Sequence, residues 1–318
     1  MSQVARFAWA TLCWNIAVVL WGAYVRATGS GAGCGNRWPL CGGDLLGAGA
    51  RGQTLVEFTH RMTSAVSLLV VTGLVVWCWR ATGKRDWARY SAVLAAIFLA
   101  NEALLGAALV LLKHVAYDNS AGRILFLCLH LGNTLLLLGS LSLTAVWLSN
   151  GDRRFRFRRN WREAGLVGAG LLATMLTGIT GAVAALADTL FPSPSLRLSL
   201  TEDFGSATPR LLHYRLIHPA AALIAAAYLL WIVFRSSAGG NRLSRSATAL
   251  VVSVLAQVGV GIANVLLLAP VWLQIVHLFV ADVLWALLVV VSADLILERA
   301  GMDESHAPAS LVEECRES

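Results

Sequence analysis

Eight long runs of apolar residues, separated by shorter polar stretches, make up most of the chain. Each run is long enough for a helix to cross a bilayer, which takes about 20 mostly apolar residues. Because every backbone polar group must find a partner within hydrocarbon, we expect all of them to be α-helices. They cover approximately residues 6–26, 55–79, 88–112, 123–149, 163–187, 210–234, 246–268 and 271–296. The pattern therefore predicts an all-α integral membrane protein with eight transmembrane helices.

The eight spans divide into two similar sets of four. NEALLGAALVLL in the third span resembles AQVGVGIANVLLL in the seventh, HLGNTLLLL in the fourth resembles HLFVADVLW in the eighth, and THRMTSAVSLL in the second resembles IHPAAALIAAA in the sixth. Three matches in the same order indicate an internal duplication. We expect two pseudo-repeated four-helix bundles, residues 1–149 and 163–297, joined by a basic linker at 150–162 and followed by a polar tail at 298–318.

Composition and charge agree with a membrane protein and orient it. The 318 residues are 57% hydrophobic and 14% charged, whereas a soluble domain carries about 25% charged residues. Most of the 25 Lys and Arg residues lie in the two termini and in the loops on the side of the membrane that holds the N-terminus. Cytoplasmic loops carry such an excess, so the linker, the tail and both termini are predicted to be cytoplasmic, in a multi-pass protein of the cell (plasma) membrane.

The basic linker contains RRFRFRRNWR, which raises the question of nucleic-acid binding. A cytoplasmic loop beside anionic lipid headgroups explains the same charges better. We therefore expect the lipid bilayer as a partner and no nucleic acid.

Four of the seven histidines stand at similar places in the even-numbered spans, a few residues from the outer end of each: His60, His130, His218 and His277. Any one of them alone would be a packing residue as readily as a ligand, but ionisable groups inside a membrane are usually functional. Two imidazoles facing each other suit a six-coordinate haem iron, whereas zinc takes three or four converging ligands. The pattern favours one haem per half, with a proton relay as the alternative.

The first histidine has an acidic neighbour. Glu57 precedes His60 by three residues, so both lie on one helix face, a turn apart. Glu57 could contact the ligand, move protons or touch a bound porphyrin; the alternative is a structural pair with Arg61 or Arg51. The corresponding residue of the second half is Arg215, which predicts chemistry at the first histidine pair and electron transfer at the second.

Two further acids, Glu102 and Asp282, lie within predicted spans. Each is expected to pair with an arginine at a helix end or to line a polar path. Neither is assigned a catalytic role.

Cys34 and Cys41 share an outer loop, CGNRWPLC. The outer compartment is oxidising, so a disulfide that holds this loop over the first histidine pair is predicted. A free thiol pair and a redox-active pair are the alternatives.

TGSGAGCGNRWPLC, EFTHRM, HLGNT and NVLLLAPVWLQIVHL together resemble the haem A synthase family, over about residues 8–296. The resemblance implies oxidation of the C8 methyl group of haem O to the formyl group of haem A, for terminal oxidase assembly. It implies that Glu57 is the catalytic acid, that His60 and His130 hold the iron of haem O, and that His218 and His277 hold the iron of haem b. Cys34 and Cys41 match the paired cysteines of the family. Pro219, directly after His218, departs from the pattern of the first half and is expected to kink its helix.

Several partners follow from this resemblance: haem O and haem A, a membrane electron donor such as a quinol or a protein, and haem O synthase. A homo-oligomer is left open. The alternative function is a non-catalytic, quinol-linked dihaem cytochrome b, which keeps all four histidines but gives Glu57 no task.

Overall fold

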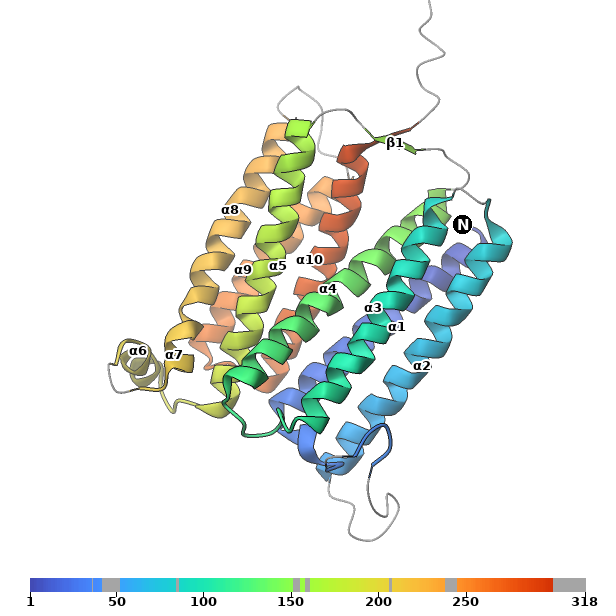
Figure 1. Cartoon of the computed structure of the whole chain (residues 1–318). Coiled ribbons are helices and arrows are strands. Elements are labelled where there is room, and N and C mark those ends of the chain that lie inside the picture. Colours follow the sequence, from blue (N-terminus) through green and yellow to red (C-terminus); the bar gives the residue numbers. More distant parts are fainter. Residues whose placement is uncertain are drawn as a thin grey trace, which may run out of the picture.

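The computed structural model describes residues 1–35, 37–41, 52–83, 86–150, 155–157, 161–205, 208–237 and 245–299. Most of the predicted linker and tail, and Arg51, lie outside these residues. The described chain is almost entirely helical (Figure 1). The long helices are α1 Gln3–Ala27, α2 Gly52–Ala81, α3 Trp87–Leu111, α4 Ala121–Asn150, α5 Trp161–Leu190, α8 Ile217–Ser237, α9 Arg245–Leu266 and α10 Val271–Ile296. The short elements are η1 Ser30–Ala32, α6 Leu196–Phe204, α7 Arg210–Arg215, β1 Phe155–Phe157 and β2 Leu297–Arg299.

Eight segments of the described chain are long and apolar enough to cross a membrane, and they coincide with the eight predicted spans. Seven of them are single helices, and the remaining one, the sixth span Arg210–Arg235, combines α7 with most of α8. The prediction of an eight-span α-helical membrane protein is therefore confirmed.

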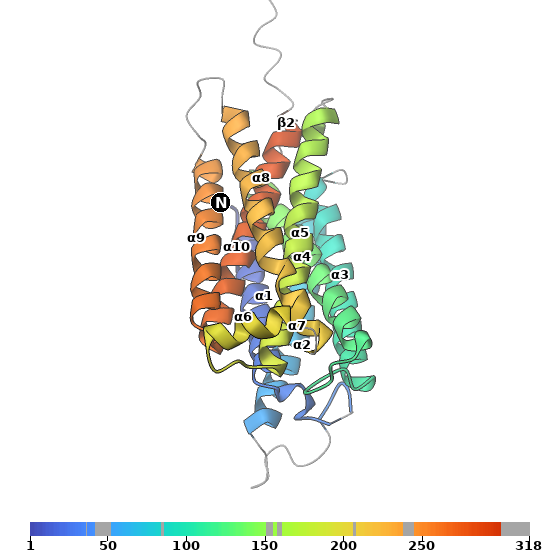
Figure 2. The ribbon, with the colours of Figure 1, turned by 90° about the vertical axis from the view of Figure 1, so that its left-hand side faces the viewer.

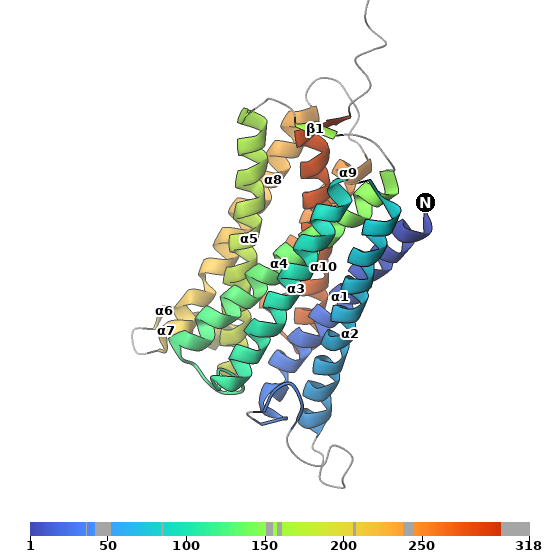
Figure 3. The same ribbon diagram turned by 45° about the vertical axis from the view of Figure 1, so that its right-hand side comes forward.

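The spans pack as two groups of four helices, which lie side by side in Figures 1 and 3. In the first group α1, α2, α3 and α4 contact one another in a ring, and in the second α5, α8, α9 and α10 do the same. The groups meet where α1 and α4 contact α5 and α10. The packing thus follows the predicted division, while a duplication as its origin stays a prediction.

Helices α3 and α9 end in the same way, at positions that the proposed repeat makes equivalent. Lys113 and Leu268 both adopt the left-handed conformation, with φ of 61° and 60°. The following N–H groups, of His114 and Ala269, donate to carbonyl oxygens five residues back at 2.8 and 2.7 Å. Such a cap satisfies carbonyl groups that a helix end leaves free.

The sixth span is broken, as Pro219 predicts. Proline has no N–H to donate and its ring clashes with the carbonyl four residues earlier, here that of Arg215. Helix α7 ends at Arg215, and α8 starts at Ile217.

The polar loop predicted between the fifth and sixth spans contains a helix that the hydrophobic pattern did not indicate. Helix α6 starts after Ser195, whose side chain accepts a hydrogen bond from the Leu198 N–H at 3.3 Å. It lies across the ends of the long helices in Figure 2. On the opposite side, β1 of the linker pairs antiparallel with β2, which follows α10.

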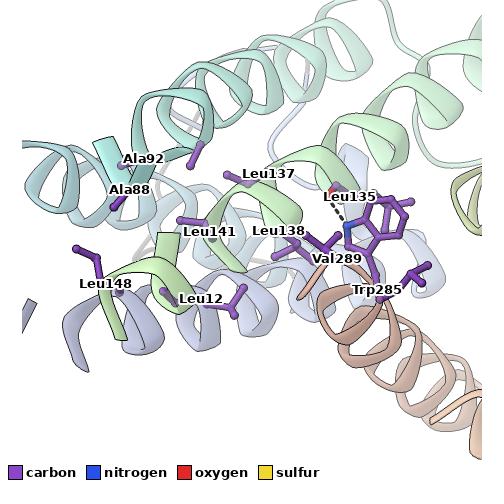
Figure 4. Packing of buried hydrophobic residues seen from close by; sticks show 14 of the residues in the cluster. Leu12, Ala88, Ala92, Leu135, Leu137, Leu138, Leu141, Leu148, Trp285 and Val289 are labelled. Atoms are coloured by element: carbon purple, nitrogen blue, oxygen red, sulfur yellow. Dashed lines mark hydrogen bonds between the residues drawn. The ribbon is translucent and has the colours of Figure 1, made fainter. Parts of the chain in front are cut away.

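Small residues bring the helices of the first group together. Ala88 and Ala92 of α3 are completely buried and belong to the same apolar cluster as Leu138 and Leu141 of α4 (Figure 4). Small side chains let helix backbones approach closely, which drives helix association in lipid.

A tryptophan joins the two groups of helices. The Trp285 indole of α10 donates a hydrogen bond to the Leu135 carbonyl of α4 at 2.6 Å (Figure 4). A side chain at Gly139 of α4 would lie 3.4 Å from this indole nitrogen. The ring is 5% exposed, so this contact fixes α10 against α4 in the interior of the protein.

Candidate functional site

The four histidines lie near one end of the molecule, the end that carries the disulfide loop and α6. Each follows the start of its span by between six and nine residues. At 1.5 Å per residue the rings are therefore about 9–14 Å from that end of the helices. All four side chains are half-buried, and they belong to α2, α4, α8 and α10.

A glycine of the preceding span lies against each imidazole ring. The pairs are Gly22–His60, Gly106–His130, Gly181–His218 and Gly261–His277. A Cβ atom added at Gly22 or Gly181 would lie 2.9 Å from the ring Cε1, and one added at Gly261 would lie 3.2 Å away. The corresponding distance at Gly106, 3.8 Å, is an ordinary contact. Three of the four histidines thus occupy space that only a glycine leaves.

His218 and His277 face each other across the second group of helices. Their ring centroids are 6.2 Å apart. Two imidazoles on opposite faces of one metal ion, with bonds of about 2.0 Å, would have centroids about 6 Å apart. The His218 Nδ1 atom lies 3.1 Å from the Thr177 carbonyl oxygen, which orients the ring and leaves Nε2 for a ligand bond. The pair therefore fits a haem iron.

His60 and His130 form the corresponding pair in the first group. They are close enough to interact electrostatically. Their buried Nδ1 atoms have no hydrogen-bond partner in the described part of the chain. Two half-buried imidazoles at similar depth in one group of helices are the donor set that a six-coordinate haem iron takes.

Glu57 is 3% exposed and both of its oxygens are occupied. Oε2 accepts a hydrogen bond from the Cys34 N–H at 2.7 Å, and Oε1 accepts one from Arg61 Nη2 at 2.5 Å. No described hydrogen bond links Glu57 to His60. Of the two arginines considered from the sequence, Arg61 is the partner, and Arg51 lies outside the described residues.

The outer loop is attached to the start of α2 through the same residues. Cys34 and Cys41 form a disulfide with a Cα–Cα distance of 4.5 Å, as predicted. Arg61 also donates to the carbonyl oxygens of Arg37 and Pro39, at 2.6 and 3.2 Å. The disulfide loop and the second and third turns of α2, which carry Glu57 and Arg61, are therefore one connected unit beside His60.

The equivalent position of the second half carries a different cluster. Arg215 donates to Asp203 Oδ1 and to Asp188 Oδ1, at 2.5 and 2.9 Å. It also reaches the Ser199 hydroxyl of α6 at 2.7 Å. Arg215 thus attaches α6 to the mouth of the second group, as Glu57 and Arg61 attach the disulfide loop to the first.

The arginine partners expected for Glu102 and Asp282 are not found within the described residues. Glu102 accepts hydrogen bonds from Asn133 and Thr134 of α4. Asp282 is completely buried, and its oxygens have no described hydrogen-bond partner. Apolar spans conceal such contacts because hydropathy does not tell which way a helix face turns.

The glycines that face the histidines were also not apparent from the sequence. A glycine in the middle of an apolar span is common in membrane helices and carries no signal by itself. The pattern that could have revealed them is the pairing of one glycine in each odd-numbered span with one histidine in the following span.

Comparison with known proteins gives the family. A family model described as "Cytochrome oxidase assembly protein" matches residues 5–289. The chain belongs to this family. Its two histidine pairs, disulfide loop and Glu57 all lie within the matched residues.

Relatives of this chain carry two different names. It is 42% identical over 296 residues to a "Protoheme IX farnesyltransferase" of Thermus thermophilus, an alignment that covers 91% of this chain and 48% of the relative. The chain therefore spans about half the length of that relative. It is 28% identical over 289 residues to the "Heme A synthase" of Listeria welshimeri, covering 87% of this chain and 90% of the relative. A "Heme A synthase" of Listeria monocytogenes is 29% identical over the same length.

Proposed function

We propose that this membrane protein is a haem A synthase, which oxidises the C8 methyl group of haem O to the formyl group of haem A for terminal oxidase assembly. The observation that carries the proposal is two glycine-backed histidine pairs near one end of the bundle, only one of which adjoins a buried glutamate. Similarity to haem A synthases over nearly their whole length supports it.

In this proposal each half holds one haem. His60 and His130 hold the iron of the substrate, haem O. His218 and His277 hold haem b, which when bound supplies one-electron transfer to or from a membrane donor. The Thr177 carbonyl orients His218 through Nδ1, and Gly181 gives its ring room.

Oxidation of a methyl to a formyl group removes protons and electrons from the substrate carbon and adds an oxygen atom, from water or O₂. The site therefore needs a group that accepts protons. Glu57 is the candidate because it is buried one helical turn from His60. The Cys34 N–H and Arg61 hold the carboxylate in place. From there it either accepts a proton or stabilises positive charge that develops next to the reacting methyl group.

The name of the Thermus thermophilus relative points to a partner rather than to another activity of this chain. That protein is about twice as long, and this chain matches about half of it. Haem O carries a farnesyl group, so farnesylation of protohaem IX makes the substrate proposed here. A farnesyltransferase that contains a segment similar to this chain supports a direct association of this chain with haem O synthase.

The proposed location is the plasma membrane, with both termini in the cytoplasm and both haem sites toward the outer face. The excess of Lys and Arg in the loops on the side of the membrane that holds the N-terminus supports this orientation. The N-terminus and the end of α10 lie at the same end of the bundle (Figure 1), and the disulfide loop lies at the other.

The test is expression in cells that make haem O but lack their own haem A synthase, followed by extraction and chromatography of the haems. We expect haem A with the unsubstituted chain and none with Glu57→Gln, although both proteins carry haem. Purified protein without any low-spin haem spectrum would contradict both haem sites.

The alternative, a dihaem cytochrome b that only transfers electrons, draws support from one observation. Both oxygens of Glu57 are engaged by Cys34 and Arg61, which is also what a purely structural role requires. Two bound haems in cells that accumulate haem O but no haem A would establish this alternative.

A further inference from the structure

The two halves differ in the side chains that surround the last histidine of each pair. In the first half, His130, Asn133 and Thr134 belong to the motif HLGNT, and their spacing places them on one face of α4. All three face Glu102 of α3: Asn133 and Thr134 donate hydrogen bonds to its oxygens, and the His130 Nδ1 atom lies 3.4 Å from Oε1.

The hydrogen bonds define the Oε2 atom of Glu102 as an acceptor. The Asn133 Nδ2 group also donates to the Phe98 carbonyl oxygen, at 2.7 Å. A carbonyl oxygen can only accept, so this end of the Asn133 amide must be the donor, and Glu102 Oε2 must accept from it. The Thr134 hydroxyl contacts Oε1, the oxygen nearest His130, and lies 2.9 Å from the His130 carbonyl oxygen as well.

The second half replaces this polar group by neutral and apolar residues. Gln257 of α9 takes the place of Glu102, four residues before the glycine that faces the histidine in each case. Its Nε2 atom lies 3.2 Å from the His277 Nε2 atom. Val280 and Ala281 stand where Asn133 and Thr134 stand in the first half. The carboxylate and the two groups that hold it are therefore exchanged together.

We propose that Glu102 is a positioning residue for His130, and that it lowers the reduction potential of the iron held by the first histidine pair. The proposal rests on the haem sites of the proposed function. A carboxylate that accepts the Nδ1 proton of a ligating histidine fixes its ring orientation and makes it a stronger donor to the metal. Stronger donation favours the oxidised iron. Gln257 carries no charge, and its contact is with the His277 Nε2 atom and not with Nδ1, so it supplies no carboxylate to this ring.

The present ring orientation needs a small adjustment. The His130 Nδ1 atom makes no aligned hydrogen bond, although it is within 3.4 Å of Glu102. A turn of the imidazole about its Cβ–Cγ bond brings the N–H toward Oε1. Gly106 leaves the space for this, because even an added Cβ there would lie 3.8 Å from the ring.

The experiment is a spectroelectrochemical titration of the purified holoprotein with both haems bound, for the unsubstituted chain and for Glu102→Gln. We expect the N-terminal haem of the variant to become easier to reduce by on the order of tenfold, which is 59 mV for one electron. The C-terminal haem in the same sample is the internal control and should not shift. An unshifted N-terminal potential, or an equal shift of both haems, would overturn the proposal.

A second variant, Glu102→Asp, keeps the charge and covers the case in which Glu102→Gln fails to hold haem. The reduction equilibrium constant of its N-terminal haem should stay within about threefold of that of the unsubstituted protein. This corresponds to a change in potential of about half of 59 mV, the value for a tenfold change. A tenfold rise in the Asp variant would show that the carboxylate charge is not the operative feature.

The titration also separates this proposal from the proposed function. A shifted potential in a protein that forms no haem A would leave the role of Glu102 standing and refute the synthase. Haem A formation with an unshifted potential would do the reverse.

Discussion

The contact between Gly181 and His218 makes a sharp prediction for the Gly181→Ala variant. The new methyl group would lie 2.9 Å from the ring Cε1 and 3.2 Å from Nδ1. Carbon atoms pack at about 3.5–4.0 Å, so the ring must retreat by roughly 0.6 Å or more. A binding site tolerates displacements of about 0.5 Å, so the histidine leaves its ligating position.

The size of the effect follows from the cost of overpacking, typically about 1–3 kcal/mol. If the strain falls on the haem-bound state, the affinity of the second pair for haem drops about 5- to 150-fold, because each 1.4 kcal/mol is a factor of ten. The helix itself should not suffer, since alanine favours a helix over glycine by about 1 kcal/mol. The loss should therefore appear in haem content and not in folding.

The assay is the haem-to-protein ratio of the purified variant, together with its low-spin absorption spectrum and thermal unfolding. Gly106→Ala is the matched control, because its added Cβ would make only an ordinary 3.8 Å contact with His130. We expect Gly181→Ala to lose the C-terminal haem and Gly106→Ala to keep both. Full haem content in Gly181→Ala, or equal loss in both variants, would refute the steric argument.

Three other substitutions test separate parts of the molecule. His277→Ala should lose the C-terminal haem and keep the N-terminal one, so an optical spectrum with two unchanged haems would contradict the pairing. Arg61→Met leaves Glu57 buried without its charged partner, and breaking such a pair costs about 3 kcal/mol; thermal unfolding should show this loss, and an unchanged melting temperature would count against the ion pair as an anchor. In the outer loop between α3 and α4, partial burial raises the pKa of Asp118, but hydrogen bonds from His114 and Ser120 outweigh it and hold this pKa below its ordinary value of 3.8. A carboxyl group whose pKa is lowered in the folded state stabilises that state above pH 3.8, and this stabilisation is lost as the pH falls further. The unsubstituted protein should therefore lose more stability than Asp118→Asn on acidification below pH 3.8. Parallel curves of stability against pH for the two proteins would disprove this contribution.

The sequence by itself was sufficient for the spans, their order and the histidines they carry. A bilayer imposes one local requirement on every span, a long apolar helix with its backbone bonded internally. That requirement can be read from consecutive residues, so the eight predicted spans match the structure closely. The disulfide between Cys34 and Cys41 was also predictable, because both cysteines lie in one short loop.

Only the tertiary structure decided which residues meet. Hydropathy places Gly181, Glu102 and Arg61 on helices but does not tell how each helix is rotated about its axis or how closely its neighbour approaches. Those quantities depend on packing between segments far apart in the chain, such as Trp285 on Leu135. The glycine beside each histidine, the attachment of the disulfide loop to Arg61 and the polar group around Glu102 all arise from that packing.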